Sequence, residues 1–470
     1  MPYSRERASK GGHSDLVRNP DVSAFLSECD FIKEPTEEET REIVSGFVDI
    51  PLTSALPSKV FASDASPYSE PINGLFPSTQ IGYVKNSIVL IDVNSYEGLK
   101  SPKSRFVDPF KVAELHRNAD AISFTLPGSN IRYKGAKTVA DGFRKAVWEQ
   151  LSDDRTKMAV GGDFNVAGTL LAIEPDNVIT ITKCPSCKDK PPIPFIFSNV
   201  TTIHICEQCH EEVYLTDSLR LHEPITEFGD NTSAITRFMN VVEHLNIANL
   251  IRMLHYYQPE TLSEMAFFVD GPLAIFGEPA DIHSRLMKLY FQIFEDLKGK
   301  GYREPLILGL IKTGQVAEHA NSLNRQLKKY AKSLNKIDKR NSVRLLTDEY
   351  KGRWISGKYD PEGCKGYETY YGQDFLFKTD SGRIFTFCIP YPFERKGNRK
   401  DFQCAKTELS KYRDTLDRTL GIIKFFELEL YENAVVPVAL AHRHASISLM
   451  PGGKVLELVS RNGLNVKNKK

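Results

Sequence analysis

Apolar runs that end at a charged residue recur along the chain, and they predict buried strands with polar tips. The run 266–269 leads into Asp270, which a Gly-Pro pair and a second apolar run follow. Such a strand tolerates a carboxylate chiefly at its end, because burying an unpaired charge is costly. We therefore expect Asp270 at a strand tip, where a metal, a cation or a turn holds it. The alternative is that Asp-Gly only marks a hairpin turn.

A similar pattern opens the folded part of the chain. The segment 60–62 predicts a short strand that ends at Asp64, and a loop rich in Pro, Ser and Gly follows. Segment 81–93 then predicts a long strand. A carboxylate at the end of a first strand, next to a neighbouring strand, is how an RNase H-like metal site begins. The alternative for Asp64 is a capping residue.

A second strand is expected to follow the Asp270 strand through a helix. Residues 282–297 predict that helix, and the apolar run after it ends at Lys312. A strand, a helix and a strand in this order form a βαβ unit, so the two strands should pair in parallel. Lys312 at the second tip could contact a phosphate, or it could be a lysine that simply leaves the core.

Two helices carry further candidates. Segment 231–257 is amphipathic, and Glu243 lies beside its apolar stripe. A glutamate there is either a metal ligand or a solvated or salt-bridged side chain. Helix 139–151 carries Arg144, which could face a phosphate or be an ordinary exposed arginine.

A run of positive charge follows the Lys312 strand. We expect a basic helix over 324–344, where one acid, Asp338, stands among many cations. These cations are Arg325, Lys328, Lys329, Lys332, Lys336, Lys339, Arg340 and Arg344. Such a face could track the phosphates of DNA, with Lys328, Lys329, Lys332 and Arg340 as the candidates, or it could be an ordinary solvated surface. His442 and His444 lie in the last apolar element, where a lone histidine is usually structural.

The cysteines give the least ambiguous signal. Of eight cysteines, four form two C-x-x-C pairs that frame a β-rich segment. These are Cys184, Cys187, Cys206 and Cys209. Two such knuckles joined by a short hairpin place four thiolates at the corners of a tetrahedron, which suits Zn²⁺. A closed Cys₄ site has no open coordination position, so we expect it to be structural.

Composition narrows the class of protein. With 470 residues, the chain should form a large core or two to three domains. Its net charge of +1 gives no global attraction to nucleic acid, so any such binding must come from local patches. The polar N-terminus is no secretory signal, no apolar run approaches a membrane span, and the cysteine pattern suits a reducing compartment. We expect a cytoplasmic protein.

Five segments, taken in order, resemble the NurA nuclease family. They are FASDAS with PSTQIGYV, VVEHLNIANLIRML, FFVDGPLAIFG, LIKTG and VPVALAHRHASI, which together span roughly residues 60–450. The resemblance implies an α/β fold with an RNase H-like mixed sheet flanked by helices. It also implies Mn²⁺-dependent cleavage of DNA by a homodimer that works with a HerA-like hexameric ATPase, in DNA end processing or anti-phage defence.

Carried over by motif, the metal ligands would be Asp64, Glu243, Asp270 and His442, with Lys312 at the phosphate. Phosphodiester hydrolysis needs a nucleophilic water and a stabilised leaving oxygen, and two divalent ions about 4 Å apart supply both. Carboxylates suit Mn²⁺ or Mg²⁺, and a histidine favours Mn²⁺. Two departures matter: the first motif has Asp-Ala-Ser where the family commonly has Asp-Gly-Ser, and many members lack the cysteine knuckles.

These readings divide the chain into five parts. We expect an N-terminal helical or disordered segment over 1–50, a first part of the core over 51–175, and the zinc ribbon inserted over 176–222. The second part of the core covers 223–460, and a basic tail covers 461–470.

Two other functions remain open from the sequence. One is a catalytically inactive zinc-ribbon adaptor that binds DNA or an ATPase, which would not need Asp64, Glu243 and Asp270 together. The other is a different RNase H-like nuclease, such as a resolvase, which would prefer branched DNA.

Overall fold

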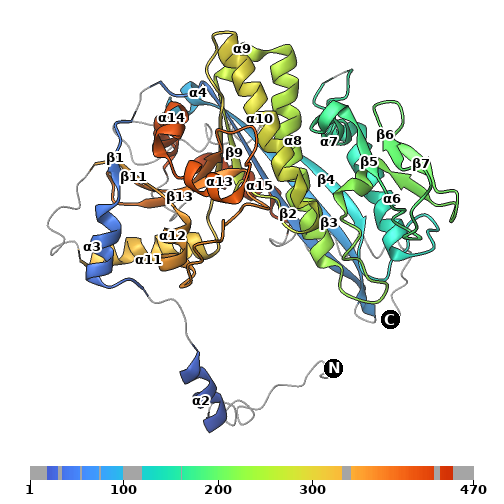
Figure 1. Ribbon diagram of the computed structural model, residues 1–470, viewed down its shortest axis with the longest axis horizontal. Coiled ribbons are helices and arrows are strands. Elements are labelled where there is room, and N and C mark those ends of the chain that lie inside the picture. Colours follow the sequence, from blue (N-terminus) through green and yellow to red (C-terminus); the bar gives the residue numbers. More distant parts are fainter. Residues whose placement is uncertain are drawn as a thin grey trace.

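The computed structural model describes residues 18–29, 34–52, 55–73, 76–98, 119–159, 161–330, 340–427 and 435–447 (Figure 1). A nine-stranded mixed sheet runs through the molecule, in the order β1-β11-β12-β13-β10-β9-β2-β3-β4. The strands are β1 (Val48–Asp49), β2 (Lys59–Asn73), β3 (Phe76–Asp92), β4 (Ala119–Pro127), β9 (Met265–Asp270), β10 (Leu306–Leu310), β11 (Ser342–Leu345), β12 (Gly372–Lys378) and β13 (Ile384–Pro390).

The centre of this sheet has the predicted RNase H-like arrangement. Strands β2, β3 and β4 form an antiparallel meander, whereas β9 pairs in parallel with β2, and β10 pairs in parallel with β9. Helix α8 (Thr232–Tyr257) precedes β9, and α10 (Ile282–Gly299) connects β9 to β10. The predicted βαβ unit and its parallel pairing are therefore confirmed.

Helices cover both faces of the sheet (Figure 1). Alternate residues of a strand point to opposite faces. On β9, Phe267 belongs to the core cluster that includes α6 (Val139–Ser152), α7 (Val166–Ala172), α8 and α10, whereas Phe268 belongs to the cluster that includes α14 (Arg413–Phe425) and α15 (Val436–Ala445). A third cluster joins α3 (Glu37–Ser45) and α11 (Gln315–Lys329) to β12 and β13. The site described below lies at the end of β9, between the helices that cover the two faces of the sheet.

The remaining elements are short. The helices are α2 (Pro20–Glu28), α4 (Val93–Glu97), α9 (Pro259–Ser263), α12 (Asp348–Tyr350), η5 (Lys351–Ile355) and α13 (Arg399–Ala405). The 3-10 turns are η1 (Asp154–Thr156), η2 (Pro175–Asn177), η3 (Leu215–Leu219), η4 (Glu278–Asp281) and η6 (Leu409–Tyr412). Two small hairpins pair β5 (Ile179–Ile181) with β6 (Phe195–Phe197), and β7 (Ile203–Ile205) with β8 (Glu212–Tyr214).

Two sequence predictions about elements are wrong. Asp64 does not end a short strand, because β2 continues for nine residues past it as one arm of the long β2–β3 hairpin. The expected basic helix over 324–344 stops at Lys329, and Arg344 lies on strand β11. Strand β11 is fixed instead by antiparallel pairing with β12, which an uninterrupted helix would prevent.

Four buried histidines, among them His222, should make the fold sensitive to acid. Burial lowers the pKa of His244 to about 3 and the pKa values of His222, His283 and His319 to about 4. Above the ordinary histidine pKa of about 6.5, both the folded and the unfolded states are neutral at these positions. As the pH falls from there toward 4, only the unfolded state takes up protons, so stability is lost across this window.

We therefore expect the free energy of unfolding to fall by about 2 kcal/mol per such histidine between pH 7.5 and pH 5. The measurement is the melting temperature at the two pH values for the wild type and His319→Gln. The variant should lose less stability than the wild type on acidification. A variant of exposed His210, His210→Gln, is the control, and an equal effect of both variants would contradict the prediction.

Candidate metal centres

Asp64 and Asp270 meet where the parallel pairing of their two strands ends. The last paired residues are Ser63 on β2 and Val269 on β9, so the two aspartates come next on both strands. Each lies two residues after a side chain in the core beneath α15, Ala62 or Phe268, and therefore points to the same face. Asp270 ends its strand as predicted, whereas Asp64 is 5% exposed within its strand.

His442 completes a cluster of three possible ligands. It lies on α15, and its Nδ1 is 2.8 Å from Oδ2 of Asp64 and 3.9 Å from Oδ2 of Asp270. One ligand atom of each of the three residues lies within 4.8 Å of the others. Val438, Ala441 and Ala445 anchor the helix in the core, and the side chain of His442 remains 60% exposed. The structure thus brings together three residues from distant parts of the sequence.

Lys312 joins this cluster from the neighbouring strand. Leu310, which ends β10, pairs with Asp270, and Lys312 follows two residues later. Its Nζ lies 2.7 Å from Oδ2 of Asp270. Lys312 therefore lies just past the tip of β10, as predicted, and its partly exposed ammonium group pairs with Asp270.

Glu243 lies behind the cluster rather than within it. Helix α8 packs on the sheet face opposite to α15, and Glu243 is 4% exposed there. Its buried Oε1 has no hydrogen-bond partner among the described residues. Burial, followed by the charges of Asp64 and Asp270, raises the pKa of Glu243 well above its ordinary value.

The three acids together create an excess of negative charge. Burial and the charge of Asp270 raise the pKa of Asp64 to about 6, against the opposing effects of His442 and Lys312. A divalent cation held by Asp64, Asp270 and His442 would relieve this repulsion. Carboxylate oxygens with one imidazole nitrogen are a donor set that fits Mn²⁺ or Mg²⁺. The residues present therefore fit such an ion.

The four predicted cysteines form a second, separate cluster. Sγ of Cys184 lies 3.6 Å from that of Cys209, and Sγ of Cys187 lies 3.9 Å from that of Cys206. Tetrahedral coordination with Zn–S bonds of about 2.3 Å requires sulfur–sulfur distances of about 3.8 Å. All four cysteines are free thiols. The geometry fits a structural Zn²⁺ ion held between the two hairpins β5–β6 and β7–β8.

A buried arginine ties this ribbon to the core, and it corrects both sequence interpretations of Arg144. The guanidinium is 3% exposed and makes a two-pronged ion pair with Asp217, at 2.7 and 2.8 Å. It also donates to Asp141 at 2.8 Å and to Ser186, which lies between two of the cysteines, at 2.6 Å. Arg144 therefore neither faces a phosphate nor lies exposed, because it is buried between Asp141 on the same helix and the distant Asp217.

Removing this arginine should destabilise the protein strongly. Arg144→Ala leaves two buried carboxylates without their cation, and we expect a loss of about 3–5 kcal/mol in the free energy of unfolding. Urea unfolding followed by circular dichroism measures the change. Lys145→Ala is the matched control, because the neighbouring Lys145 makes only a half-exposed pair with Glu212 at 3.3 Å. Equal midpoints for the two variants would show that the buried network has no such role.

The candidate DNA-binding residues do not form the continuous basic helix face that the sequence predicted. Arg340 pairs with Asp49 at 2.6 Å, and Nζ of Lys329 lies 5.0 Å from the ring centre of Tyr330. Arg325, from the same charge run, pairs with Glu34. Lys332 lies outside the described residues, as do Lys336 and Lys339. Because the run spans a helix end and a strand, it forms no single helical face.

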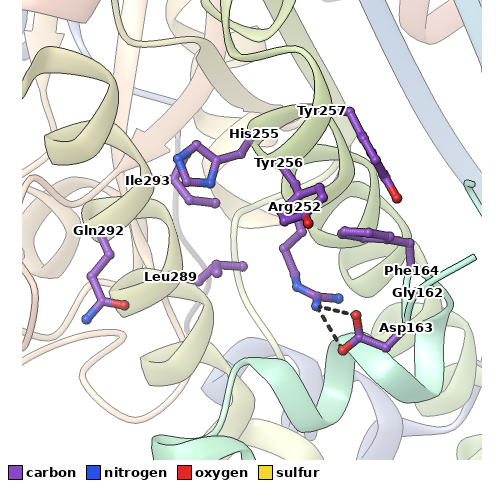
Figure 2. A pocket seen from close by; sticks show the side chains of 10 residues that line it. All are labelled: Gly162, Asp163, Phe164, Arg252, His255, Tyr256, Tyr257, Leu289, Gln292 and Ile293. Atoms are coloured by element: carbon purple, nitrogen blue, oxygen red, sulfur yellow. Dashed lines mark hydrogen bonds and ion pairs between the residues drawn. The ribbon is translucent and has the colours of Figure 1, made fainter. Parts of the chain in front are cut away.

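One feature that the sequence did not reveal is a surface pocket at the far end of α8 (Figure 2). Its volume is about 660 Å³, and it lies away from the carboxylates. Its walls come from α8, α10 and the turn before α7, namely Gly162, Asp163, Phe164, Arg252, His255, Tyr256, Tyr257, Leu289, Gln292 and Ile293. The only sequence signal is the Tyr-Tyr pair that ends an otherwise amphipathic helix.

Comparison with known proteins adds a likeness of fold. No protein-family model matches the chain, and no curated protein matches it. Among solved structures, it is similar to the NurA nuclease from Sulfolobus solfataricus, at 8% identity over 98% of this chain and 100% of that chain, with a TM-score of 0.37. It is also similar to a second NurA structure, at 9% identity over 98% and 99% of the chains, with a TM-score of 0.29.

Both are structures from the family that the sequence motifs resemble. At these TM-scores the likeness carries no argument about activity. Among the described residues, no helix is both long and apolar enough to cross a membrane.

Proposed function

We propose that this protein is a divalent-metal-dependent nuclease that hydrolyses phosphodiester bonds in DNA. The observation that carries the proposal is the convergence of Asp64, Asp270 and His442 within 4.8 Å. These residues come from two strands and a helix on one face, and Glu243 approaches from the other. Acids that repel one another in this way cost stability, so their convergence calls for a function.

Each residue has a distinct part in this proposal. Asp64 and Asp270 hold Mn²⁺ or Mg²⁺ through their carboxylates, His442 adds a nitrogen, and Glu243 is the third carboxylate. When bound, such ions supply an activated water and stabilise the leaving oxygen. Lys312 orients Asp270 through its ion pair and offers positive charge at the edge where a phosphate would lie. The exposed side of His442 leaves the centre open to a large substrate.

The zinc ribbon has a structural part in the proposal. Four thiolates close the coordination sphere of Zn²⁺, so that ion would organise residues 176–222 as an inserted unit. The other proposed boundaries are an N-terminal segment over 1–50, core parts over 51–175 and 223–460, and a basic tail over 461–470.

The partners are proposed from the family resemblance and from charge. A chain with a net charge of +1 has little general affinity for DNA, since affinity grows with the number of phosphates neutralised. A homodimer docked on a HerA-like hexameric ATPase would be held on DNA by that ATPase. The pair would act in DNA end processing or anti-phage defence. If so, cleavage of a long duplex should depend on that ATPase and ATP, whereas short single strands are cut without it.

The direct test is hydrolysis of labelled single- and double-stranded DNA with Mn²⁺, Mg²⁺ or no added metal. Wild type should cleave only with metal, and Asp64→Asn should not cleave under any condition. An inactive adaptor would bind DNA without cleaving it, and a resolvase would cleave four-way junctions in preference to linear DNA. Equal cleavage by wild type and Asp64→Asn would contradict the proposal.

A further inference from the structure

The pocket at the end of α8 is lined by two exposed aromatic rings that lie outside the hydrophobic core (Figure 2). Tyr256 is 71% exposed and Tyr257 is 50% exposed. Their ring centres are 4.7 Å apart with planes at 85°, and Phe164 lies 5.8 and 5.5 Å from them. The three rings form an angled wall in which Tyr256 and Tyr257 are exposed to solvent and the buried Phe164 packs behind them.

A chain of buried hydrogen bonds positions this wall. Arg252 donates from Nη1 to Oγ1 of Thr169 at 2.8 Å, and that hydroxyl donates to Oδ1 of Asn249 at 3.1 Å. The amide of Asn249 then donates to the backbone carbonyl of Phe164 at 3.1 Å. Thr169 and Asn249 are fully buried. Burying polar side chains is costly unless they are bonded, and here the bonds fix Arg252 and Phe164 at the pocket.

The guanidinium of Arg252 adds a cation to the aromatic wall. It lies 5.4 Å from the ring centre of Phe164, and its Nη2 reaches the half-exposed Asp163 only at 3.3–3.4 Å (Figure 2). Good charged hydrogen bonds are about 2.7–2.9 Å long, so this ion pair is loose. A ligand that accepts hydrogen bonds can replace Asp163 while its flat part stacks on a ring.

We propose that this pocket binds an unpaired nucleobase of single-stranded DNA, at a site separate from the carboxylate centre. The inference rests on the proposed nuclease function for its substrate. Flat rings beside an arginine are how proteins hold single strands without reading their sequence. A volume of about 660 Å³ falls within the range of small-ligand pockets. Bases in a duplex are stacked inside the helix and cannot reach these rings.

The position of the pocket sets the length of strand that can use both sites. Tyr256 follows Glu243 by 13 residues on the same helix (256 − 243 = 13), which corresponds to about 20 Å. At a stacked spacing of 3.4 Å per nucleotide, this axial distance alone takes about six nucleotides, and a strand that also passes from the α8 face to the face of His442 needs more. Longer single strands should therefore bind more tightly than very short ones.

The test is fluorescence anisotropy with a twenty-nucleotide oligo(dT), a four-nucleotide oligo(dT) and a blunt duplex, with neither divalent metal nor chelator added. Tyr256→Ala/Tyr257→Ala should weaken binding of the long single strand about tenfold to a hundredfold. Duplex binding should not change. Phe228→Ala, which removes another exposed ring, is the matched control and should bind like wild type. Photocross-linking with iodouracil in the strand should label Tyr256 or Tyr257.

Other outcomes would overturn the inference. Unchanged binding of the long strand, or an equal loss for duplex, would exclude an unpaired base as the ligand. Competition by thymidine monophosphate as strong as that by the strand would assign the pocket to free nucleotides. A change only in oligomeric mass on gel filtration would assign the rings to a protein interface. Because no cleavage is measured, failure of the proposed nuclease activity would be recognised separately.

Discussion

Replacing Asp270 with asparagine is expected to abolish DNA cleavage, with a fall in kcat of at least about a thousandfold. Asp270 lies at the centre of the cluster, since one of its oxygens meets both Lys312 and His442. Without its charge, the remaining ligands hold a divalent ion weakly and Lys312 loses its partner. The measurement is single-turnover cleavage of labelled DNA at saturating Mn²⁺.

The fold should survive this change. Asparagine has nearly the same shape, and the charge of Asp270 now raises the pKa of Asp64, so the variant relieves a repulsion. The melting temperature should stay the same or rise. Asp154→Asn, at a highly exposed carboxylate, is the control and should cleave like wild type. Cleavage by Asp270→Asn within tenfold of wild type, in a preparation free of other nucleases, would remove Asp270 from the site.

The second large effect concerns zinc. Cys184→Ser should reduce the zinc content from about one ion per chain to almost none, because a closed four-thiolate site loses most of its affinity with one ligand. Ligation and local folding are coupled, so hydrogen exchange should accelerate across β5, β6, β7 and β8. Metal analysis by mass spectrometry and hydrogen-exchange mass spectrometry provide the two measurements.

The matched control is Cys404→Ser, because Cys404 is an exposed free thiol outside the ribbon. It should leave zinc content and exchange unchanged. If purified wild type contained no zinc, or if Cys184→Ser retained it, the cluster would have another role. Hydrogen exchange in β9 and β10 should change less, because these strands do not hold the cysteines and α6 connects the ribbon to the core through Arg144.

Local chemistry made part of this structure predictable. The Asp270 strand, its parallel partner and the cysteine cluster were foreseeable because apolar runs and C-x-x-C spacing act over a few residues. Asp64 was assigned to the wrong kind of position, since the polar segment after it joins a strand only through pairing with β3. No local sequence pattern predicts that pairing of β2 with β3.

Long-range contacts account for the remaining differences. Arg144 is buried because Asp217, 73 residues away, meets it, and neither residue signals the other in the sequence. Glu243 reaches the back of the cluster only because α8 crosses the opposite face of the sheet. The basic run ends its helix at Lys329 because the chain must return as β11.

The most direct test of the central claim is an anomalous diffraction measurement on crystals grown with Mn²⁺. The account predicts a strong manganese peak within bonding distance of Asp64 and Asp270, with His442 or Glu243 completing the ligands, and its disappearance in Asp270→Asn. A protein that cleaves DNA in Mn²⁺ while its crystals show manganese only at other acidic side chains would contradict the account.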